Sequence, residues 1–158
     1  MTDILIRPAR FPEDAETVRK LFRDYTDWLN VPLDFQDLET ELATLPGKYA
    51  APEGVVLLAL STDGSALGCV ALRPLDGVTC EMKRMYLRDE ARGLGLGRAL
   101  ADAILQSARE AGYRRMVLDT LARLTEAVRL YERFGFQQVP AYYENPLPGV
   151  IYLGRDLY

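Results

Sequence analysis

Four segments of the chain repeat apolar residues every three or four positions, which predicts amphipathic helices. The first helix opens at Pro12-Glu13-Asp14, where a proline and two acidic residues favour a helix start. The second is shorter and closes at Pro46-Gly47. The apolar stripes are Val18, Leu21, Phe22, Tyr25 and Leu29 in the first segment, Phe35, Leu38, Leu42 and Leu45 in the second, and Leu96, Leu100 and Ile104 in the third, which runs to about Ala111; the fourth covers residues 124–134.

Between these segments, short apolar runs bounded by turn residues predict β-strands. Asp63-Gly64 joins two of the runs and is a strong hairpin signal. The order β-αα-β-β-β-α-β-α-β-β predicts an α/β or α+β fold with a mixed sheet. No linker or repeat divides the chain, so we expect one domain over residues 1–158. The strand runs are 4–7, 55–60, 66–72, 78–87, 115–119, 136–139 and 150–157.

The composition is that of a globular protein and argues against several partners. Hydrophobic residues make up 49% of the 158 residues, and the net charge of −4 argues against nucleic-acid binding, which needs a basic surface. No apolar run approaches about 18 residues and the first residues lack an apolar signal core, so we expect no membrane partner. Cys69 and Cys80 lie in separate strand runs, and we expect them to be buried thiols of a cytoplasmic protein.

The chain contains no histidine, and this absence limits its chemistry. Ser-His-Asp and Cys-His arrangements and histidine-containing zinc sites are excluded. Two cysteines alone do not form a structural zinc site, so we expect no metal. Any general base must come from Asp, Glu, Tyr, Lys, Cys or a chain of water molecules.

The segment EARGLGLGRAL, residues 90–100, is typical of a phosphate site. Free N–H groups at a helix start bind anions, and glycines let the backbone approach a ligand closely. A nucleotide P-loop does not fit, because Arg98-Ala99 stands where Lys-Ser/Thr is required. The Gly-x-Gly-x-Gly spacing disfavours a dinucleotide fingerprint, although Asp119 lies at a plausible distance for a ribose contact. A glycine loop without a ligand is the alternative.

Arg92-Gly93-Leu94-Gly95-Leu96-Gly97 resembles the Arg/Gln-x-x-Gly-x-Gly/Ala signature of the GNAT superfamily of N-acetyltransferases. In that family the signature follows the fourth strand and opens the next helix, as it does in the predicted order. Residues 126–136, EAVRLYERFGF, resemble the second family signature, Ala-x-x-Leu-Tyr-x-x-x-Gly-Phe. The similarity covers essentially the whole chain. It implies a mixed, mainly antiparallel sheet of six to seven strands flanked by about four helices.

The resemblance implies acetyl-CoA as co-substrate and transfer of its acetyl group to a primary amine by direct attack in a ternary complex. The pantetheine arm is expected to pair with the strand edge at Met85 and Leu87, for which core packing is the alternative role. The pyrophosphate is expected on a loop that consists of Arg92, Gly93, Leu94, Gly95, Gly97 and Arg98.

Glu81 is our candidate for the general base that removes the proton of the attacking amine. It stands four residues before Met85, where well-known members of the family have a glutamate base. In a regular strand Glu81, Met85 and Leu87 share one face, with Glu81 roughly 13 Å from Met85, so a water relay would help. The alternative is a structural glutamate that faces solvent or pairs with Lys83 or Arg84.

Tyr131 occupies the tyrosine position of the second signature, which implies that it protonates the leaving thiolate of CoA. A phenol with a pKa of about 10 can donate a proton at neutral pH. The alternative is simple packing, because Ala127, Leu130, Tyr131 and Phe134 form one amphipathic stripe. Leu124 replaces an asparagine that the family often has, which puts one polar contact of the relay in doubt.

In this fold the early helices and the loop before the last strand usually shape the acceptor site. Trp28 and Tyr143 are our candidate acceptor contacts, since aromatic rings suit a cationic amine. A small amine, an amino acid, a polyamine, an antibiotic and a protein lysine are all open as acceptor, and the family also allows a homodimer. The competing interpretation is a non-catalytic acyl-CoA-binding or sensor domain on the same fold, which Glu81 and Tyr131 disfavour. A nicotinamide oxidoreductase ranks third.

Overall fold

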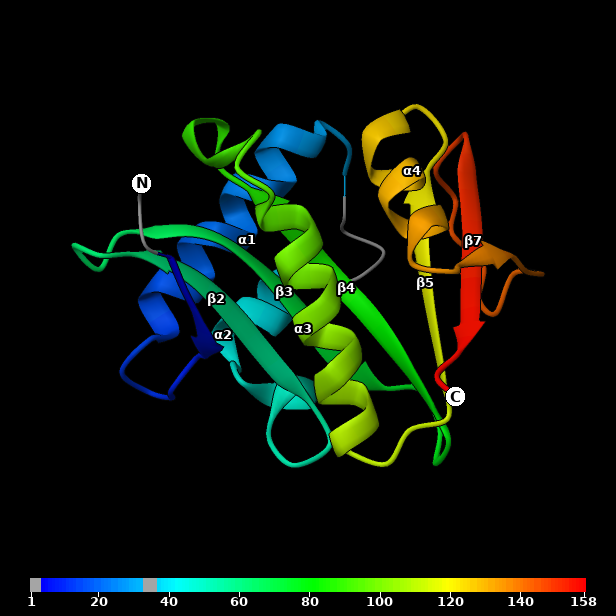
Figure 1. Ribbon diagram of the computed structural model, residues 1–158, viewed down its shortest axis with the longest axis horizontal. Helices are drawn as coiled ribbons and strands as arrows, with labels where there is room; N and C mark the ends of the chain where they lie inside the picture. Colours follow the sequence, from blue (N-terminus) through cyan, green and yellow to red (C-terminus); the bar gives the residue numbers. More distant parts are fainter. Residues whose placement is uncertain (1–3, 33–36) are drawn as a thin grey trace.

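The computed structural model describes residues 4–32 and 37–158 and shows a seven-stranded sheet with helices on both faces (Figure 1). Its elements are β1 (Ile4–Pro8), α1 (Ala15–Leu29), α2 (Leu38–Ala43), β2 (Val55–Ser61), β3 (Ala66–Pro74), β4 (Thr79–Leu87), α3 (Leu96–Glu110), β5 (Arg115–Leu121), α4 (Thr125–Arg133), β6 (Gln137–Gln138) and β7 (Val150–Asp156). Helices α1 and α2 cover one face of the sheet, and α3 and α4 cover the other. The predicted mixed, mainly antiparallel sheet flanked by helices is confirmed.

The sheet consists of two antiparallel groups that meet at β4 and β5. Strands β1 to β4 form a meander, and β5, β7 and β6 form the second group, in the order β1-β2-β3-β4-β5-β7-β6. The two groups are joined by parallel pairing of Thr79 with Arg115, Cys80 with Met116 and Glu81 with Val117. Beyond these pairs β4 and β5 separate, so the edge of β4 from residue 82 to residue 87 stays open toward β5 in the described structure.

Apolar side chains form one core on each face of the sheet. Leu100, Ile104 and Met116 are fully buried in the core under α3 and α4, while Leu21 and Phe22 are fully buried in the core under α1 and α2. Burial on both faces explains why β2 and β3 read as near-continuous apolar runs rather than as alternating ones.

The two cysteines are buried free thiols, as predicted. Cys69 packs in the core under α1 and α2, and Cys80 packs in the core under α3 and α4. Burial raises the pKa of both thiols to about 12, so both stay protonated at neutral pH.

The second helix is shorter than predicted, since α2 covers only Leu38–Ala43. Leu42 from its predicted stripe is buried, whereas Phe35 lies outside the described residues. None of the helices in the described part of the chain has the length and apolar character needed to cross a bilayer. Residues 4–32 and 37–158 also contain no cluster of three or more acidic or cysteine side chains able to hold a metal ion.

A β-bulge at Arg84 changes the direction of the side chains along β4. Arg84 has a φ of +60°, and the register between β3 and β4 shifts by one residue at this point. Glu81 therefore lies beside Arg73 of β3 on the α1 and α2 face, whereas Met85 and Leu87 pack against the opposite core. The prediction that Glu81, Met85 and Leu87 share one face is wrong, because the bulge interrupts the alternation between them.

Candidate active site

The glycine loop, residues 92–98, connects β4 to the first turn of α3. Gly93 and Gly95 have φ values of +81° and +78°, a left-handed conformation that glycine adopts without steric cost. Apart from chain neighbours, no atom lies within 4 Å of the place that a Cβ would take at either glycine, so this backbone faces open space. Helix α3 begins at Leu96, and the first N–H groups of a helix have no partner inside it. The loop is therefore suited to an anion.

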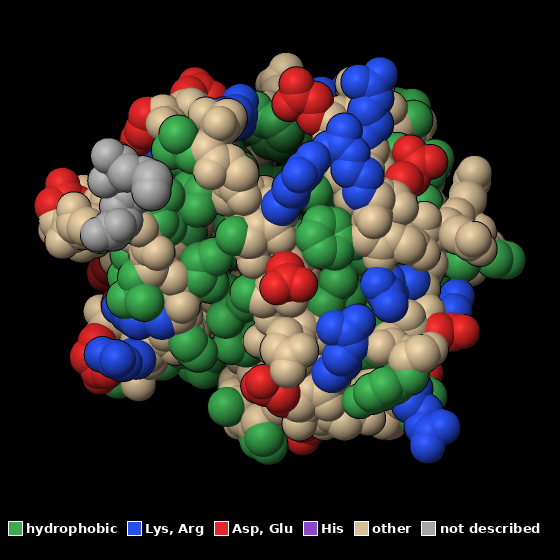
Figure 2. Space-filling model, viewed as in Figure 1, with side chains coloured by type: hydrophobic (Ala, Val, Ile, Leu, Met, Phe, Trp, Pro, Cys, Tyr) green, Lys and Arg blue, Asp and Glu red, His purple; other side chains and the backbone are tan. Residues whose placement is uncertain are grey.

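Basic side chains gather near this helix start although the chain is acidic overall. Figure 2 shows Lys and Arg side chains over α4 and toward the start of α3. Arg98 is exposed in the first turn of α3, and Arg129 and Arg133 are exposed on α4. Arg92 has a different role, since its guanidinium group stacks 5.0 Å from the ring centre of Trp28 and ties the loop to α1.

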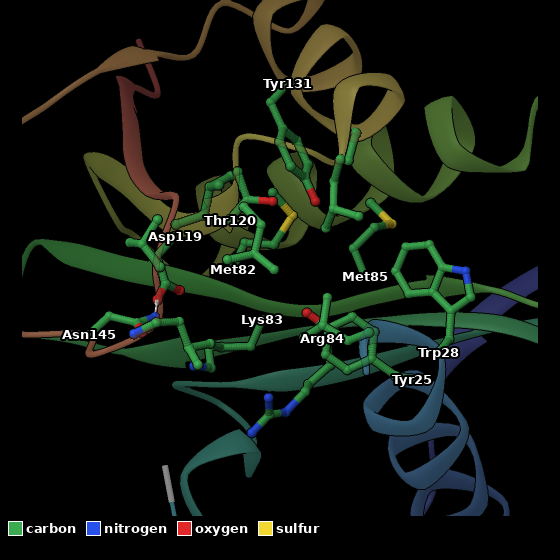
Figure 3. A pocket seen from close by; sticks show the side chains of 17 residues that line it. Tyr25, Trp28, Met82, Lys83, Arg84, Met85, Asp119, Thr120, Tyr131 and Asn145 are labelled. Atoms are coloured by element: carbon green, nitrogen blue, oxygen red, sulfur yellow. Dashed lines mark hydrogen bonds between the residues drawn. The ribbon is translucent and has the colours of Figure 1, made fainter. Parts of the chain in front are cut away.

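A cavity lies where β4 and β5 separate (Figure 3). Side chains of α1, β4, β5, α4 and the loop before β7 line this central cavity, among them Met82, Lys83, Asp119 and Tyr131. Of the residues predicted from the sequence, the lining contains Trp28, Met85 and Tyr131, whereas Glu81, Leu87, Tyr143 and the glycine loop lie outside it.

Tyr131 projects from α4 into the central cavity, with its hydroxyl group toward the opening between β4 and β5 (Figure 3). Its ring packs edge-on against Phe136, with 6.0 Å between the ring centres. Burial raises the pKa of the Tyr131 hydroxyl above its usual value, so the group is protonated and can donate a hydrogen bond at neutral pH. The packing role and the donor role considered from the sequence are therefore compatible.

Glu81 is buried behind the cavity in a polar network of its own. Arg73 Nε donates a hydrogen bond of 2.8 Å to one carboxylate oxygen, and the hydroxyl group of Tyr142 donates to the other. Burial and the negative charge of Glu81 raise the pKa of Tyr142, which keeps this tyrosine protonated as a donor. The ion-pair partner of Glu81 is Arg73 and not Lys83 or Arg84, since only Arg73 lies directly opposite on β3.

Lys83 and Asp119 are cavity residues that the sequence analysis did not select for this site. Lys83 is 6% exposed, and burial lowers the pKa of its amine to about 8 although Glu81 and Asp119 attract the charged form. Asp119 lies on β5 and accepts hydrogen bonds from the Tyr143 hydroxyl group and, at 2.8 Å, from Asn145 Nδ2. Tyr143 therefore orients Asp119 from outside the cavity lining.

Helix α1 supplies an aromatic wall to the cavity. The rings of Tyr25 and Trp28 lie 6.3 Å apart, and Trp28 is 40% exposed. Arg84 lies 6.0 Å from the Tyr25 ring centre and forms an ion pair of 3.1 Å with Glu41 of α2. The two rings therefore present apolar surface to the cavity, and Glu41 neutralises the charge of Arg84 beside them.

The opening between β4 and β5 connects two differently built sides of the cavity. Figure 3 shows Tyr131 on one side of the strands and Lys83 and Arg84 on the other. The Tyr131 side adjoins α4 and is lined by Met82, Met85 and Ala127, while the second side carries the charged groups. Such an arrangement suits the transfer of a group from an extended anionic ligand on one side to a polar acceptor on the other.

Comparison with known proteins identifies the family to which this architecture corresponds. The sequence model of the Acetyltransferase (GNAT) family matches residues 16–136, a stretch that contains the glycine loop and α4. An uncharacterized N-acetyltransferase of Schizosaccharomyces pombe is 44% identical over 157 residues, covering 99% of this chain and 96% of that protein.

Solved structures show the same fold. A GNAT-family acetyltransferase from Staphylococcus aureus matches with a TM-score of 0.82 at 20% identity, covering 99% of this chain and 100% of that one. The yncA protein of Salmonella typhimurium, described with its cofactor acetyl-CoA, matches with a TM-score of 0.73 at 19% identity, covering 99% and 95% of the two chains.

Proposed function

This chain belongs to the GNAT acetyltransferase family, and on that premise we propose that it transfers the acetyl group of acetyl-CoA to a primary amine. The amine attacks the thioester directly, with both substrates bound at once. One observation carries the proposal: Met85 of the open β4 edge and Tyr131 line a single cavity, and the glycine loop follows that same strand in the chain.

The glycine loop is the part of the chain that would hold the pyrophosphate of acetyl-CoA. The open space in front of Gly93 and Gly95 fits such a group, since side chains at these positions would fill it. Arg98 adds a cation for charge-assisted contacts with phosphate oxygens. Met85 and Leu87 would offer backbone N–H and C=O groups to the pantetheine arm, because no strand pairs with this edge of β4 in the described structure. When bound, acetyl-CoA supplies the activated thioester.

Tyr131 would protonate the sulfur of the leaving thiolate. Its hydroxyl group is buried, protonated and directed into the cavity, which are the properties that a general acid needs. The anionic form of a buried tyrosine is unfavourable, so reprotonation after each turnover is thermodynamically favoured.

Glu81 would act at the far end of a proton relay, because its carboxylate does not line the cavity. The amine would give its proton to a water molecule, and the water would give a proton to the Tyr142 oxygen. Tyr142 would at the same time pass its own proton to the Glu81 carboxylate that it already contacts. Arg73 holds this carboxylate in place from the opposite side.

Release of CoA in the presence of a panel of amines tests the proposal. Acetyl-CoA binding is measured in parallel by thermal unfolding, where a ligand at about 100 times its Kd adds roughly 2.7 kcal/mol of stability. Tyr131→Phe should bind acetyl-CoA but transfer slowly, and the matched control Tyr158→Phe, at a residue that is 83% exposed, should behave as the wild type.

Two results would contradict the proposal. Stabilisation by acetyl-CoA without CoA release for any amine would favour a non-catalytic acyl-CoA-binding domain. Stabilisation by NADH alone would favour a nicotinamide enzyme.

A further inference from the structure

The acceptor side of the central cavity is formed by Lys83, Arg84, Asp119 and Asn145. It contains one cation, Lys83, that has no anionic partner among residues 4–32 and 37–158. Arg84 is neutralised by Glu41, and the nearby Arg73 of β3 is neutralised by Glu81. No hydrogen bond or ion pair from a described residue reaches the amine of Lys83.

Lys83 is nevertheless held in a buried position. Only 6% of the residue is exposed, and it contributes to the cavity lining. No buried side-chain nitrogen or oxygen atom of the described chain lacks a partner, so the Lys83 amine reaches the cavity space instead of being sealed in the protein. A buried cation that faces a cavity is suited to bind an anionic group there, because water is largely excluded and the interaction is strong.

Asp119 supplies the opposite charge on the facing strand β5. Two neutral donors, Tyr143 and Asn145, fix its carboxylate, and no described cation lies within ion-pair distance of it. Its charge favours the protonated form of Lys83, so the two groups lie within electrostatic reach of each other. The cavity is therefore lined by a cation and an anion that lie within electrostatic reach of each other.

We propose that the acetyl acceptor is an α-amino acid, whose carboxylate binds Lys83 and whose ammonium group binds Asp119 before it loses its proton. The inference rests on the proposed acetyl transfer and names its acceptor class. An α-amino acid carries the two charges close together, as the site requires. A polyamine would place only positive charge beside Lys83, and the side-chain amine of a protein lysine has no carboxylate close to it. The apolar residues Leu29, Leu147 and Val150 of the lining offer apolar surface to the amino-acid side chain.

Matched acceptors test the inference. CoA release is measured with the standard L-amino acids, and then with the carboxamide of each amino acid that reacts, at equal concentrations of unprotonated amine. Isoamylamine and spermidine serve as acceptors without a carboxylate. The wild type should show at least a tenfold higher kcat/KM for the acids than for their carboxamides. Lys83→Met should lose this preference through a KM for the acids that rises at least tenfold, and Lys83→Arg should retain most of it. Lys48→Met, which removes an exposed lysine that follows α2 in the chain and does not line the central cavity, is the control.

Calorimetric binding of the same compounds to the enzyme saturated with CoA separates this inference from the proposed function, because it needs no turnover. Binding of acids tenfold tighter than their carboxamides, abolished in Lys83→Met, supports an α-amino-acid site at Lys83; if no CoA is released as well, the acetyltransferase proposal fails and the site binds amino acids without acetylating them. Equal binding of acids and carboxamides, or faster transfer to isoamylamine or spermidine, overturns the inference while leaving acetyl transfer intact.

Discussion

Replacing Lys83 with methionine should make the free protein more stable while it impairs acceptor binding. The pKa of the Lys83 amine is lowered from 10.5 to about 8, first of all by burial. A change of one in pKa corresponds to about 1.4 kcal/mol, so keeping the protonated amine inside the fold costs about 3 kcal/mol. Methionine has a similar length and no charge, and it removes this cost. For a chain of this size the midpoint of thermal unfolding should rise by roughly 6–12 °C at pH 7.

The pH dependence gives the sharper test of this reasoning. Below pH 8 the amine is protonated in both the folded and the unfolded chain, so the full cost applies. Between pH 8 and pH 10.5 the folded chain loses its proton first, and the unfolded chain then binds more protons. The free energy of unfolding of the wild type therefore rises relative to that of Lys83→Met as pH increases through this window. The other charged groups that act on this amine are Glu81 and Arg84 of β4, Asp119 of β5 and Arg73 of β3.

Urea unfolding followed by circular dichroism measures the difference in free energy of unfolding between wild type and Lys83→Met at pH 7, 8.5 and 9.5. Lys48→Met serves as the exposed control. The expected result is a difference of about 3 kcal/mol at pH 7 that shrinks toward pH 9.5. A variant that is less stable than the wild type, or a difference that does not change with pH, would refute the claim that a buried charge is held at this position.

Three further substitutions test other parts of the site. Tyr131→Phe should lower kcat roughly 100-fold, the typical contribution of a general acid, with the Kd of acetyl-CoA unchanged in a calorimetric titration. Gly95→Ala should cost about 1–2 kcal/mol in urea unfolding, because alanine is strained in the left-handed conformation that Gly95 adopts, and it should weaken CoA binding in the same titration, because its Cβ enters the open space in front of the loop. Tyr142→Phe removes a donor from the buried Glu81 carboxylate and should cost about 1–3 kcal/mol in urea unfolding; an unchanged unfolding midpoint would argue against that hydrogen bond.

The sequence predicted the elements of this fold well, because each apolar run or stripe marks the face on which a strand or helix packs against another element. It did not predict the bulge in β4. Residues with positive φ are usually Gly, Asn or Asp, and an arginine such as Arg84 seldom adopts this conformation, so its residue type does not indicate a bulge. The run from Glu81 to Leu87 therefore appeared to alternate regularly, and the positions after the bulge were assigned to the wrong face.

The site was predicted only where a local motif marks it. The glycine loop and Tyr131 belong to contiguous signatures, whereas the Arg73–Glu81 pair depends on the register between two strands, which no local pattern specifies. Lys83 carried a usable signal, since a lysine in a strand covered on both faces must be buried and is rare without a partner. Its proximity to Asp119 follows from the parallel alignment of β4 and β5, which is a property of the assembled sheet.

The separation of β4 from β5 also has a mechanical meaning. In the described structure the ladder between β4 and β5 has three residue pairs, so the sheet consists of two plates joined along a short seam. A ligand lying along the seam would act as a clamp between the plates. Its binding would stiffen the protein along a line that crosses the whole molecule, and the gap between Tyr131 and Lys83 would become fixed when the first substrate arrives.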